Sequence, residues 1–307
     1  MKKIYIILVS VFVLISITIK AQQVPHYTQY MYNMNIINPA YAGARADISI
    51  GLLTRQQWVG LEGTPETETF SINARTFDSV GMGLSVVQDK IGLLEDTNLN
   101  VDISYTMVTS HDTRLAFGIK GGFSNYTNNL SLGLTPDNDT YTDLSGRYPN
   151  AGFGMFFYSK NYYLGLSIPQ LFNTPKFRLD SNSFSSVLNE HQSYFLTYGY
   201  VFNVNDNVKF KPSTLVKFNN DLPLSVDLNA NILFKDQIEF GLSYRYNDSV
   251  SGMLALILSK RFRVGYSYDY TLTNLGNFNS GSHELMLLID FNFKKRGRWL
   301  NDSSCYF

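Results

Sequence analysis

Period-two alternation of apolar and polar residues recurs along most of the chain and constrains its fold more than any other feature. In NLNVDISYTM (residues 98–107) every second residue is apolar, and the residues between them are Asn, Asp, Ser or Thr. The segments ETETFSINARTF (66–77) and PLSVDLNANILF (223–234) repeat this pattern. Successive side chains of a β-strand point to opposite faces, whereas a helix needs an apolar period near 3.6. The sequence therefore predicts an all-β protein whose strands have one apolar and one polar face.

The composition indicates which environment the apolar face meets. Charged residues make up 16% of the chain, below the roughly 25% of soluble domains, while aromatic residues make up 15%. A soluble β-sandwich also alternates, but its outward faces are rich in Lys, Glu and Thr, whereas here the polar face carries Asn, Ser, Gly and Tyr. After the N-terminal region, no apolar run reaches the roughly 18 residues of a spanning helix. We therefore predict a transmembrane outer-membrane β-barrel with its apolar face toward lipid.

The alternation divides the barrel into about fourteen antiparallel strands. We expect them to begin near Ala46, Thr67, Gly81, Asn98, Arg114, Ala151, Tyr162, Ser193, Val208, Leu224, Ile238, Ser251, Phe262 and His283. The even-numbered joins are short, whereas the odd-numbered joins include all the long ones: the RQQW segment, 89–97, 124–150, 169–192 and 271–282. Bacterial barrels have short periplasmic turns and longer outside loops. This alternation of join lengths predicts that both termini lie in the periplasm.

The sequence indicates four segments. Residues 1–21, MKKIYIILVSVFVLISITIKA, place two lysines before an apolar run that ends at an alanine, which favours a cleaved secretory signal peptide over an uncleaved membrane anchor. Residues 22–45 form a periplasmic or lumen-docked segment, because a frayed tail has no use for its many aromatic residues. Residues 46–293 form the barrel, and residues 294–307 form a C-terminal extension.

Two unusual segments flank the first strand, NPAYAG before it and RQQW after it. Proline fixes φ and glycine adopts conformations that other residues resist, so the Pro and Gly of NPAYAG would set the turn into the strand. Trp58 offers a large apolar surface, and Arg55 can donate several hydrogen bonds to a lumen carboxylate such as Asp102 or Asp227. We expect both segments to be ordered against the barrel. The structural or partner-contact candidates are Asn38, Pro39, Tyr41, Gly43, Arg55 and Trp58.

The sequence offers no catalytic constellation. His283 and Glu284 are adjacent but lack a second His at metalloprotease spacing, and no G-x-S-x-G motif occurs. The four His residues lie far apart in the sequence, so neither a metal nor another cofactor is expected. A formal net charge of +0 argues against nucleic acid, whose phosphates require a strong positive surplus. We therefore expect a protein that is not an enzyme and whose surroundings are outer-membrane lipid.

A series of motifs occurs in a fixed order along the chain: NPAYAG, RQQW, GMGLSVVQDKIG, GLSIPQLF, GLSYRY, VGYSYDY and GSHELML. Their combination resembles the PorP/SprF family of outer-membrane proteins associated with the type IX secretion system of Bacteroidetes, over about residues 24–293. The resemblance implies an outer-membrane barrel without catalytic activity. It also implies a specific secreted partner, such as an adhesin with a C-terminal sorting domain, which the barrel helps to export or to hold at the cell surface.

The sequence leaves two alternatives open. Family members near the motility branch are tied to gliding, whereas those near the core branch are candidates for contact with periplasmic ring and motor components. The same alternation also fits a passive outer-membrane porin or small-solute channel, which is the alternative function. The predicted lumen face, rich in Gly, Ser, Asn and Tyr, favours a plug or narrow pore over an open, charge-lined channel.

Overall fold

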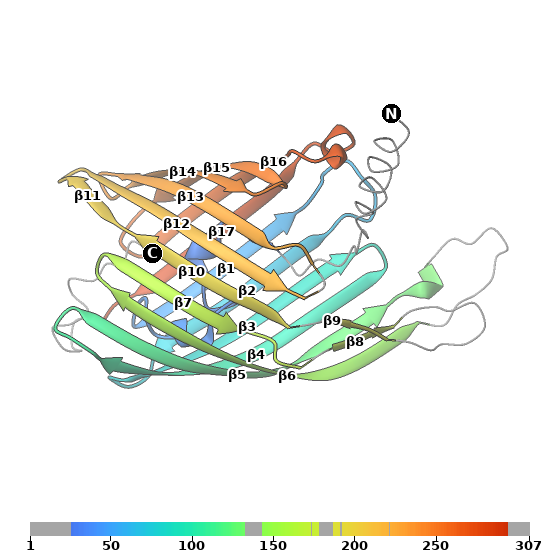
Figure 1. The fold of residues 1–307 in the computed structure, drawn as a ribbon, viewed down its shortest axis with the longest axis horizontal. Helices are drawn as coiled ribbons and strands as arrows, with labels where there is room; N and C mark the ends of the chain where they lie inside the picture. Colours follow the sequence, from blue (N-terminus) through green and yellow to red (C-terminus); the bar gives the residue numbers. More distant parts are fainter. Residues whose placement is uncertain are drawn as a thin grey trace, which may run out of the picture.

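The structure, a computed structural model, describes residues 26–132, 143–172, 174–177, 187–190, 192–220 and 222–293. The described part is almost entirely β, with a few short 3-10 turns, and Figure 1 shows its strands wound into a barrel. The prediction of an all-β barrel of about fourteen antiparallel strands is confirmed. Among the described residues, no helix is long and apolar enough to cross a membrane. The predicted signal peptide (1–21) and C-terminal extension (294–307) lie outside the described residues.

The barrel wall consists of β1 (Ile48–Gln56), β2 (Glu66–Arg75), β3 (Val80–Ile91), β4 (Leu94–Val108), β5 (Thr113–Asn128), β6 (Leu144–Ser159), β7 (Tyr162–Ile168), β10 (Ser193–Tyr200), β12 (Val208–Asn219), β13 (Ser225–Phe234), β14 (Ile238–Arg245), β15 (Ser249–Ile257), β16 (Phe262–Thr271) and β17 (Ser282–Phe291). Each strand is antiparallel to its neighbours, and β1 closes the barrel by pairing with β17. The short β11 (Phe202–Asn205) pairs with β12 beyond β10. In a separate small sheet, β8 (Thr174–Phe177) pairs with β9 (Val187–Glu190).

The barrel has two different mouths. The turn mouth carries short joins such as 160–161 and 206–207, and there β1 begins and β17 ends. The loop mouth carries longer joins, including 57–65 and 272–281. The prediction that the turn mouth faces the periplasm rests on this difference in join length.

Two joins at the loop mouth are shorter than the sequence predicts. The expected loop 89–97 is wrong, because β3 and β4 run through most of it and meet in a tight turn at Gly92, whose φ is +60°. The expected loop 124–150 is also too long, since β5 and β6 reduce it to 129–143. Beyond the lipid, outward positions no longer need apolar side chains, and charged residues such as Glu95 occupy the strand extensions. The alternation therefore fades before the strands end.

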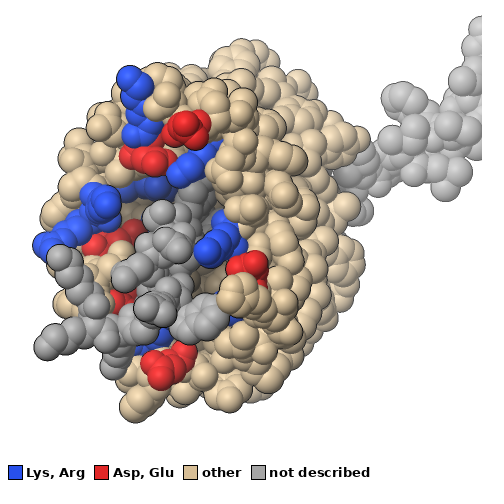
Figure 2. Space-filling view, turned by 90° about the vertical axis from the view of Figure 1, so that its left-hand side faces the viewer, with Lys and Arg blue, Asp and Glu red and all other residues tan. Residues whose placement is uncertain are grey.

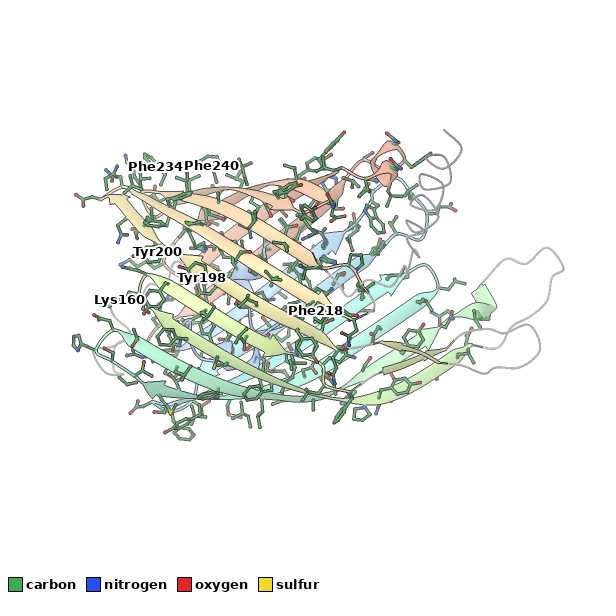
Figure 3. All side chains as sticks on the ribbon, viewed as in Figure 1. Lys160, Tyr198, Tyr200, Phe218, Phe234 and Phe240 are labelled. Atoms are coloured by element: carbon green, nitrogen blue, oxygen red, sulfur yellow. The ribbon has the colours of Figure 1, made fainter. Side chains whose placement is uncertain are left out.

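Large apolar side chains cover the outside of the wall. Figure 3 shows Tyr200 and Phe234 toward the turn mouth and Phe218 toward the loop mouth. Tyr198 and Phe240 are 45% and 57% exposed, which on a barrel means that they face outward. Bands of aromatic side chains near both ends are typical of barrels that cross a membrane. The predicted apolar-out, polar-in alternation is confirmed.

Charged side chains gather at the turn mouth. Figure 2 looks at this mouth and shows Lys and Arg together with Asp and Glu around the opening, while the visible outer wall is largely free of them. Lys160 and Lys260 are exposed in its turns, and Lys209 Nζ lies 2.7 Å from Asp236 Oδ1. Charges are costly in hydrocarbon and stable in water. The lipid-facing band therefore ends at this rim.

The segment 26–47, which we call the plug, lies inside the barrel. From Tyr27 to Asp47 every residue except Ile36 is buried, and the segment contains two 3-10 turns. Its apolar side chains belong to two clusters with lumen-facing residues of the wall. Full burial of one large apolar side chain stabilises a protein by about 1.5–3 kcal/mol. The plug therefore forms much of the core of this protein.

Candidate functional site

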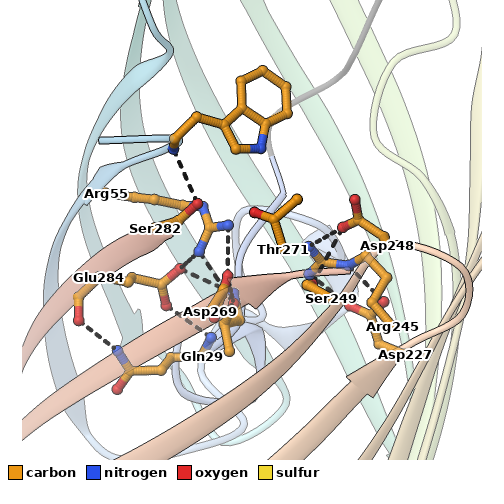
Figure 4. A network of polar contacts seen from close by, with 12 residues as sticks. Gln29, Arg55, Asp227, Arg245, Asp248, Ser249, Asp269, Thr271, Ser282 and Glu284 are labelled. Carbon is orange, nitrogen blue, oxygen red and sulfur yellow. Dashed lines mark hydrogen bonds and ion pairs between the residues drawn. The ribbon is translucent and has the colours of Figure 1, made fainter. Parts of the chain in front are cut away.

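A buried ion-pair network holds the plug to the wall near the loop mouth (Figure 4). Arg55 on β1 lies directly across from Glu284 on β17. Its Nη2 lies 2.7 Å from Asp269 Oδ2 and its Nη1 lies 3.1 Å from Glu284 Oε2. The backbone N–H groups of Thr28 and Gln29 donate to the two oxygens of Glu284 at 2.9 and 2.8 Å. One cation thus orients two carboxylates, and these bind the beginning of the plug. We call this network the loop-mouth anchor.

A second ion pair contacts the middle of the plug. Lys120 Nζ on β5 lies 3.2 Å from Asp102 Oδ1 on β4, and both side chains are almost completely buried. Asn35 Nδ2 donates to Asp102 Oδ2 at 3.1 Å. Lys120 Nζ donates to the carbonyl oxygens of Asn35 and Ile36, both at 3.3 Å. The pair therefore satisfies polar groups of a chain segment that has no regular secondary structure here.

A third network fixes the end of the plug at the turn mouth. Arg45 Nε lies 3.0 Å from Asp290 Oδ2, and Asp47 Oδ2 accepts a hydrogen bond from the backbone N–H of Phe293 at 2.6 Å. Asp290 is close to the end of β17, and Asp47 immediately precedes β1. The plug is therefore held at both mouths and between them.

Cation–π contacts clamp one plug tyrosine. Lys211 Nζ lies 5.2 Å and Arg263 Cζ 5.0 Å from the ring centroid of Tyr32. Arg263 Nη1 is also 3.8 Å from Glu239 Oε2. Cation–π contacts stabilise by about 2 kcal/mol or more when desolvated, and Tyr32 is 3% exposed.

Glycines of the wall make room for the plug. A Cβ at Gly118 would lie 2.3 Å from Ala40 N, and one at Gly154 would lie 2.1 Å from Asn38 Oδ1. A Cβ at Gly81 would meet plug backbone at 2.0 Å. Real Cβ atoms do not approach other heavy atoms so closely. These lumen-facing glycines are therefore required for the plug to lie against the wall.

Four of the six candidates predicted from the sequence lie in the plug. Asn38 caps the second 3-10 turn, because its Oδ1 accepts the Ala40 N–H at 3.0 Å. Its Nδ2 donates to the carbonyl oxygen of Met155 on β6 at 3.1 Å. Pro39 begins the turn, and the ring of Tyr41 at its end packs edge-on against Phe156 with the centroids 5.3 Å apart.

The fourth plug candidate, Gly43, turns the chain toward β1. Its φ is +73°, a region that favours glycine. Its carbonyl oxygen accepts hydrogen bonds from Arg75 Nε and Nη2 at 3.2 and 3.1 Å. A side chain at this position would meet the backbone of Gly81 at 2.9 Å. Both the backbone conformation and the close approach therefore require glycine.

Trp58, in the first loop after β1, lies at the loop mouth and not in the plug. Its φ is +49°, which is unusual for a bulky residue. Its backbone N–H donates to Ser282 Oγ at 3.2 Å, and the next N–H, of Val59, donates to the carbonyl of Gly281 at 2.9 Å. Bonds to Gly281 and to Ser282, the first residue of β17, therefore fix the backbone that carries the half-buried indole.

A cavity of about 420 Å³ opens at the loop mouth. Trp58 and Leu222 give it an apolar wall, and its charged lining residues are Arg55, Lys217, Arg245, Asp248 and Asp269. His26, the first described residue of the plug, also lines the cavity. We call it the loop-mouth pocket. Since both the plug and the wall contribute to it, its shape depends on the plug being in place.

The expected partners of Arg55 are wrong. Asp102 pairs with a lysine on the neighbouring strand and Asp227 pairs with an arginine, so neither is available to Arg55. Its partners are Asp269 and Glu284, which sequence reasoning missed. The register between the first and last strands, which places Arg55 opposite Glu284, is the signal that identifies them.

The arrangement is suited to holding a chain. Its charged groups are paired with one another or bind plug backbone. Within the described residues, no group of three or more His, Cys, Asp or Glu side chains could hold a metal ion.

We expect the plug to loosen at its first turn on acidification. Burial, Lys217, Arg245 and Arg55 lower the pKa of His26 well below its ordinary 6.5. A released segment therefore takes up a proton below about pH 6.5, whereas the seated segment resists protonation, so lower pH favours release. The opening equilibrium of the plug, obtained from hydrogen exchange after division by the intrinsic amide exchange rate at each pH, should rise between pH 7.5 and 5.5 in the wild type and change less in His26→Gln. An identical rise in both proteins would contradict a role for His26.

Solved structures with a similar fold are outer-membrane barrels. The CymD monoaromatic hydrocarbon channel is 10% identical, with a TM-score of 0.50 over 85% of this chain and 93% of that chain. Omp33 of Acinetobacter baumannii is 9% identical, with a TM-score of 0.48 over 81% of this chain and 100% of that chain. The toluene transporter TbuX of Ralstonia pickettii is 10% identical, with a TM-score of 0.47 over 83% and 92%. At these identities the likeness concerns the fold alone.

Sequence comparison gives a more specific result. No curated protein sequence matches the chain. The profile of a family described as "Type IX secretion system membrane protein PorP/SprF" matches residues 19–289.

Proposed function

Because the chain belongs to the PorP/SprF family of type IX secretion system membrane proteins, we propose that it assists the export or surface attachment of one specific secreted partner. The protein is an outer-membrane β-barrel. Its proposed partner is a type IX substrate with a C-terminal sorting domain, adhesin-like and related to gliding if the chain belongs to the motility branch. Periplasmic ring or motor components are further proposed partners. The proposed role is not enzymatic.

The plug is the observation that carries this proposal beyond family membership. A passive channel needs a continuous water-filled lumen, whereas here twenty of the lumen-docked residues from Tyr27 to Asp47 are buried against the wall. The plug is held at three levels, by an ion pair to Asp290 at the turn mouth and by hydrogen bonds to two ion pairs of the wall. A filled barrel is suited to presenting surfaces at its mouths. The loop-mouth pocket, with Trp58 in its wall, is the surface that we propose for partner contact.

The alternative is a small-solute channel whose plug moves aside. It is favoured by one observation, the pocket of about 420 Å³ that already opens the loop mouth. The two functions differ in what a deletion strain loses. A passive channel changes solute uptake, while a partner-specific barrel changes the surface proteome.

The first test is surface proteomics of a strain that lacks the protein. We expect one or a few type IX substrates to disappear from the surface while unrelated type IX substrates remain, because the barrel acts on its own client. Complementation with the wild-type chain serves as the control. Loss of every type IX substrate would instead indicate a core component. Loss of none, together with altered solute uptake, would favour the channel.

Trp58→Ala should reduce display of that substrate several-fold without reducing the amount of barrel. A large aromatic side chain at the centre of an interface commonly contributes about 2 kcal/mol or more to binding, and Trp58 is held in place by backbone bonds that the substitution retains. Phe278→Ala is the matched control, because Phe278 is also at the loop mouth, is 70% exposed and does not line the pocket. Equal display of the substrate in both variants would show that Trp58 is not part of the contact surface.

A further inference from the structure

The two ends of the described chain lie at opposite mouths of the barrel. His26 lines the loop-mouth pocket together with Trp58 and Asn247, which both belong to joins at that mouth. Phe293 donates its backbone N–H to Asp47 beside the start of β1, at the turn mouth. The strands alone would put the two ends of the wall at the same mouth, since β1 begins where β17 ends. The plug is what separates them.

Contacts along the plug trace its path through the lumen. Near the loop mouth, Thr28 binds Glu284, the third residue of β17. Farther in, Asn33 Oδ1 accepts a hydrogen bond from Ser71 Oγ at 2.7 Å, in the middle of β2. At the turn mouth, Arg45 reaches Asp290, next to the last residue of β17. The plug therefore passes through the lumen from one mouth to the other.

Withdrawal of the plug to the turn mouth would be costly. Glu284 would lose two backbone donors, and Asp102 would lose the amide of Asn35. The wall glycines would face space that no side chain of the wall fills, as at Gly118. Buried carboxylates without donors and lumen cavities both destabilise a fold. The through-lumen path is therefore the stable arrangement.

We propose that the chain crosses the outer membrane inside its own barrel, before its first strand, so that His26 lies at the loop mouth, opposite the mouth at which β1 begins. The alternation of join lengths predicts that both termini are periplasmic. That prediction considers only the strands of the wall, and the plug adds one more crossing. With the turn mouth in the periplasm, His26 lies at the cell-surface mouth of the barrel. There it lines the loop-mouth pocket that we propose for partner contact. The crossing does not depend on the proposed function.

Site-specific labelling on whole cells tests this crossing. In a Cys305→Ser background, single cysteines replace His26, Asn247 at the loop mouth and Lys260 at the turn mouth. A membrane-impermeant maleimide is applied to intact and to permeabilised cells, and heat-modifiability confirms that each barrel is folded. We expect His26→Cys to label under the same conditions as Asn247→Cys and under the opposite conditions to Lys260→Cys. Labelling of His26→Cys together with Lys260→Cys would overturn the proposal, whichever mouth faces outward.

A second measurement is needed if His26→Cys reacts poorly with maleimide, because His26 is only partly exposed. A streptavidin-binding peptide is inserted directly before His26, and streptavidin is added to intact cells. Streptavidin binding on the side where Asn247→Cys labels supports the crossing. Binding only on the side where Lys260→Cys labels would show that the segment enters and leaves the barrel at the turn mouth.

Discussion

Gly118→Ala is expected to displace the plug and to turn a closed barrel into an ion-conducting one. The new Cβ would lie 2.3 Å from Ala40 N and 2.5 Å from Ala40 Cα, so the obstacle is backbone and not a movable side chain. Overpacking of this kind costs about 1–3 kcal/mol even where side chains can adjust. The wall itself is unaffected, because β5 keeps its pairing with β4 and β6. The plug therefore yields before the barrel does.

Conductance in planar bilayers measures this effect, with protease sensitivity of the plug as a second readout. The wild type should show rare openings, and Gly118→Ala should conduct steadily. Gly121→Ala is the matched control, since Gly121 lies on the same strand and a Cβ there meets no atom within 4 Å. If Gly118→Ala does not conduct and its plug stays resistant to protease, the space at this glycine is not required for the plug to bind the wall.

Arg55→Ala is expected to destabilise the folded barrel by about 3–5 kcal/mol, the usual cost of breaking a buried ion pair from one side. The substitution leaves Asp269 and Glu284 without their cation in a site where both are almost completely buried. Arg55 Nη1 also donates to Thr28 Oγ1 at 3.1 Å, so the plug loses a direct contact as well. Barrel abundance should therefore fall together with substrate display, in contrast to Trp58→Ala.

Denaturant midpoints of the heat-modifiable folded form measure this loss. Lys209→Ala is the control, because the pair between Lys209 and Asp236 is exposed at the turn mouth and such pairs contribute about 1 kcal/mol or less. Adding Glu284→Gln to Arg55→Ala should recover part of the loss, since one unpaired buried charge is removed. A midpoint for Arg55→Ala equal to that of Lys209→Ala would mean that the network does not stabilise the fold.

The wall was predictable because lipid imposes a pattern on it. From β12 onward every strand begins within two residues of the predicted start, and outward apolar residues define each of these strands. The largest error is the start of β6, at Leu144 and not near Ala151, in a part of the wall where the outward face no longer needs to be apolar. Where the solvent outside the barrel changes from lipid to water, alternation no longer reports strand length.

The site was less predictable because its contacts join distant parts of the chain. The aromatic segment before β1 suggests docking, but no pattern indicates that Ala40 would need the glycine at position 118. The partners of Arg55 depend on barrel closure, which brings the last strand beside the first. Asp102 and Asp227 have the right chemistry and the right face, and only three-dimensional placement excludes them.

The plug is continuous with the wall, since Asp47 ends the plug and Ile48 begins β1. A plug displaced by a partner would therefore remain tethered at the turn mouth. A short tether gives an effective concentration on the order of millimolar, so re-entry would be unimolecular. Cutting the chain once at this junction would make the same displacement permanent. The covalent link would thus let the plug return to the lumen after a partner leaves, without a second protein.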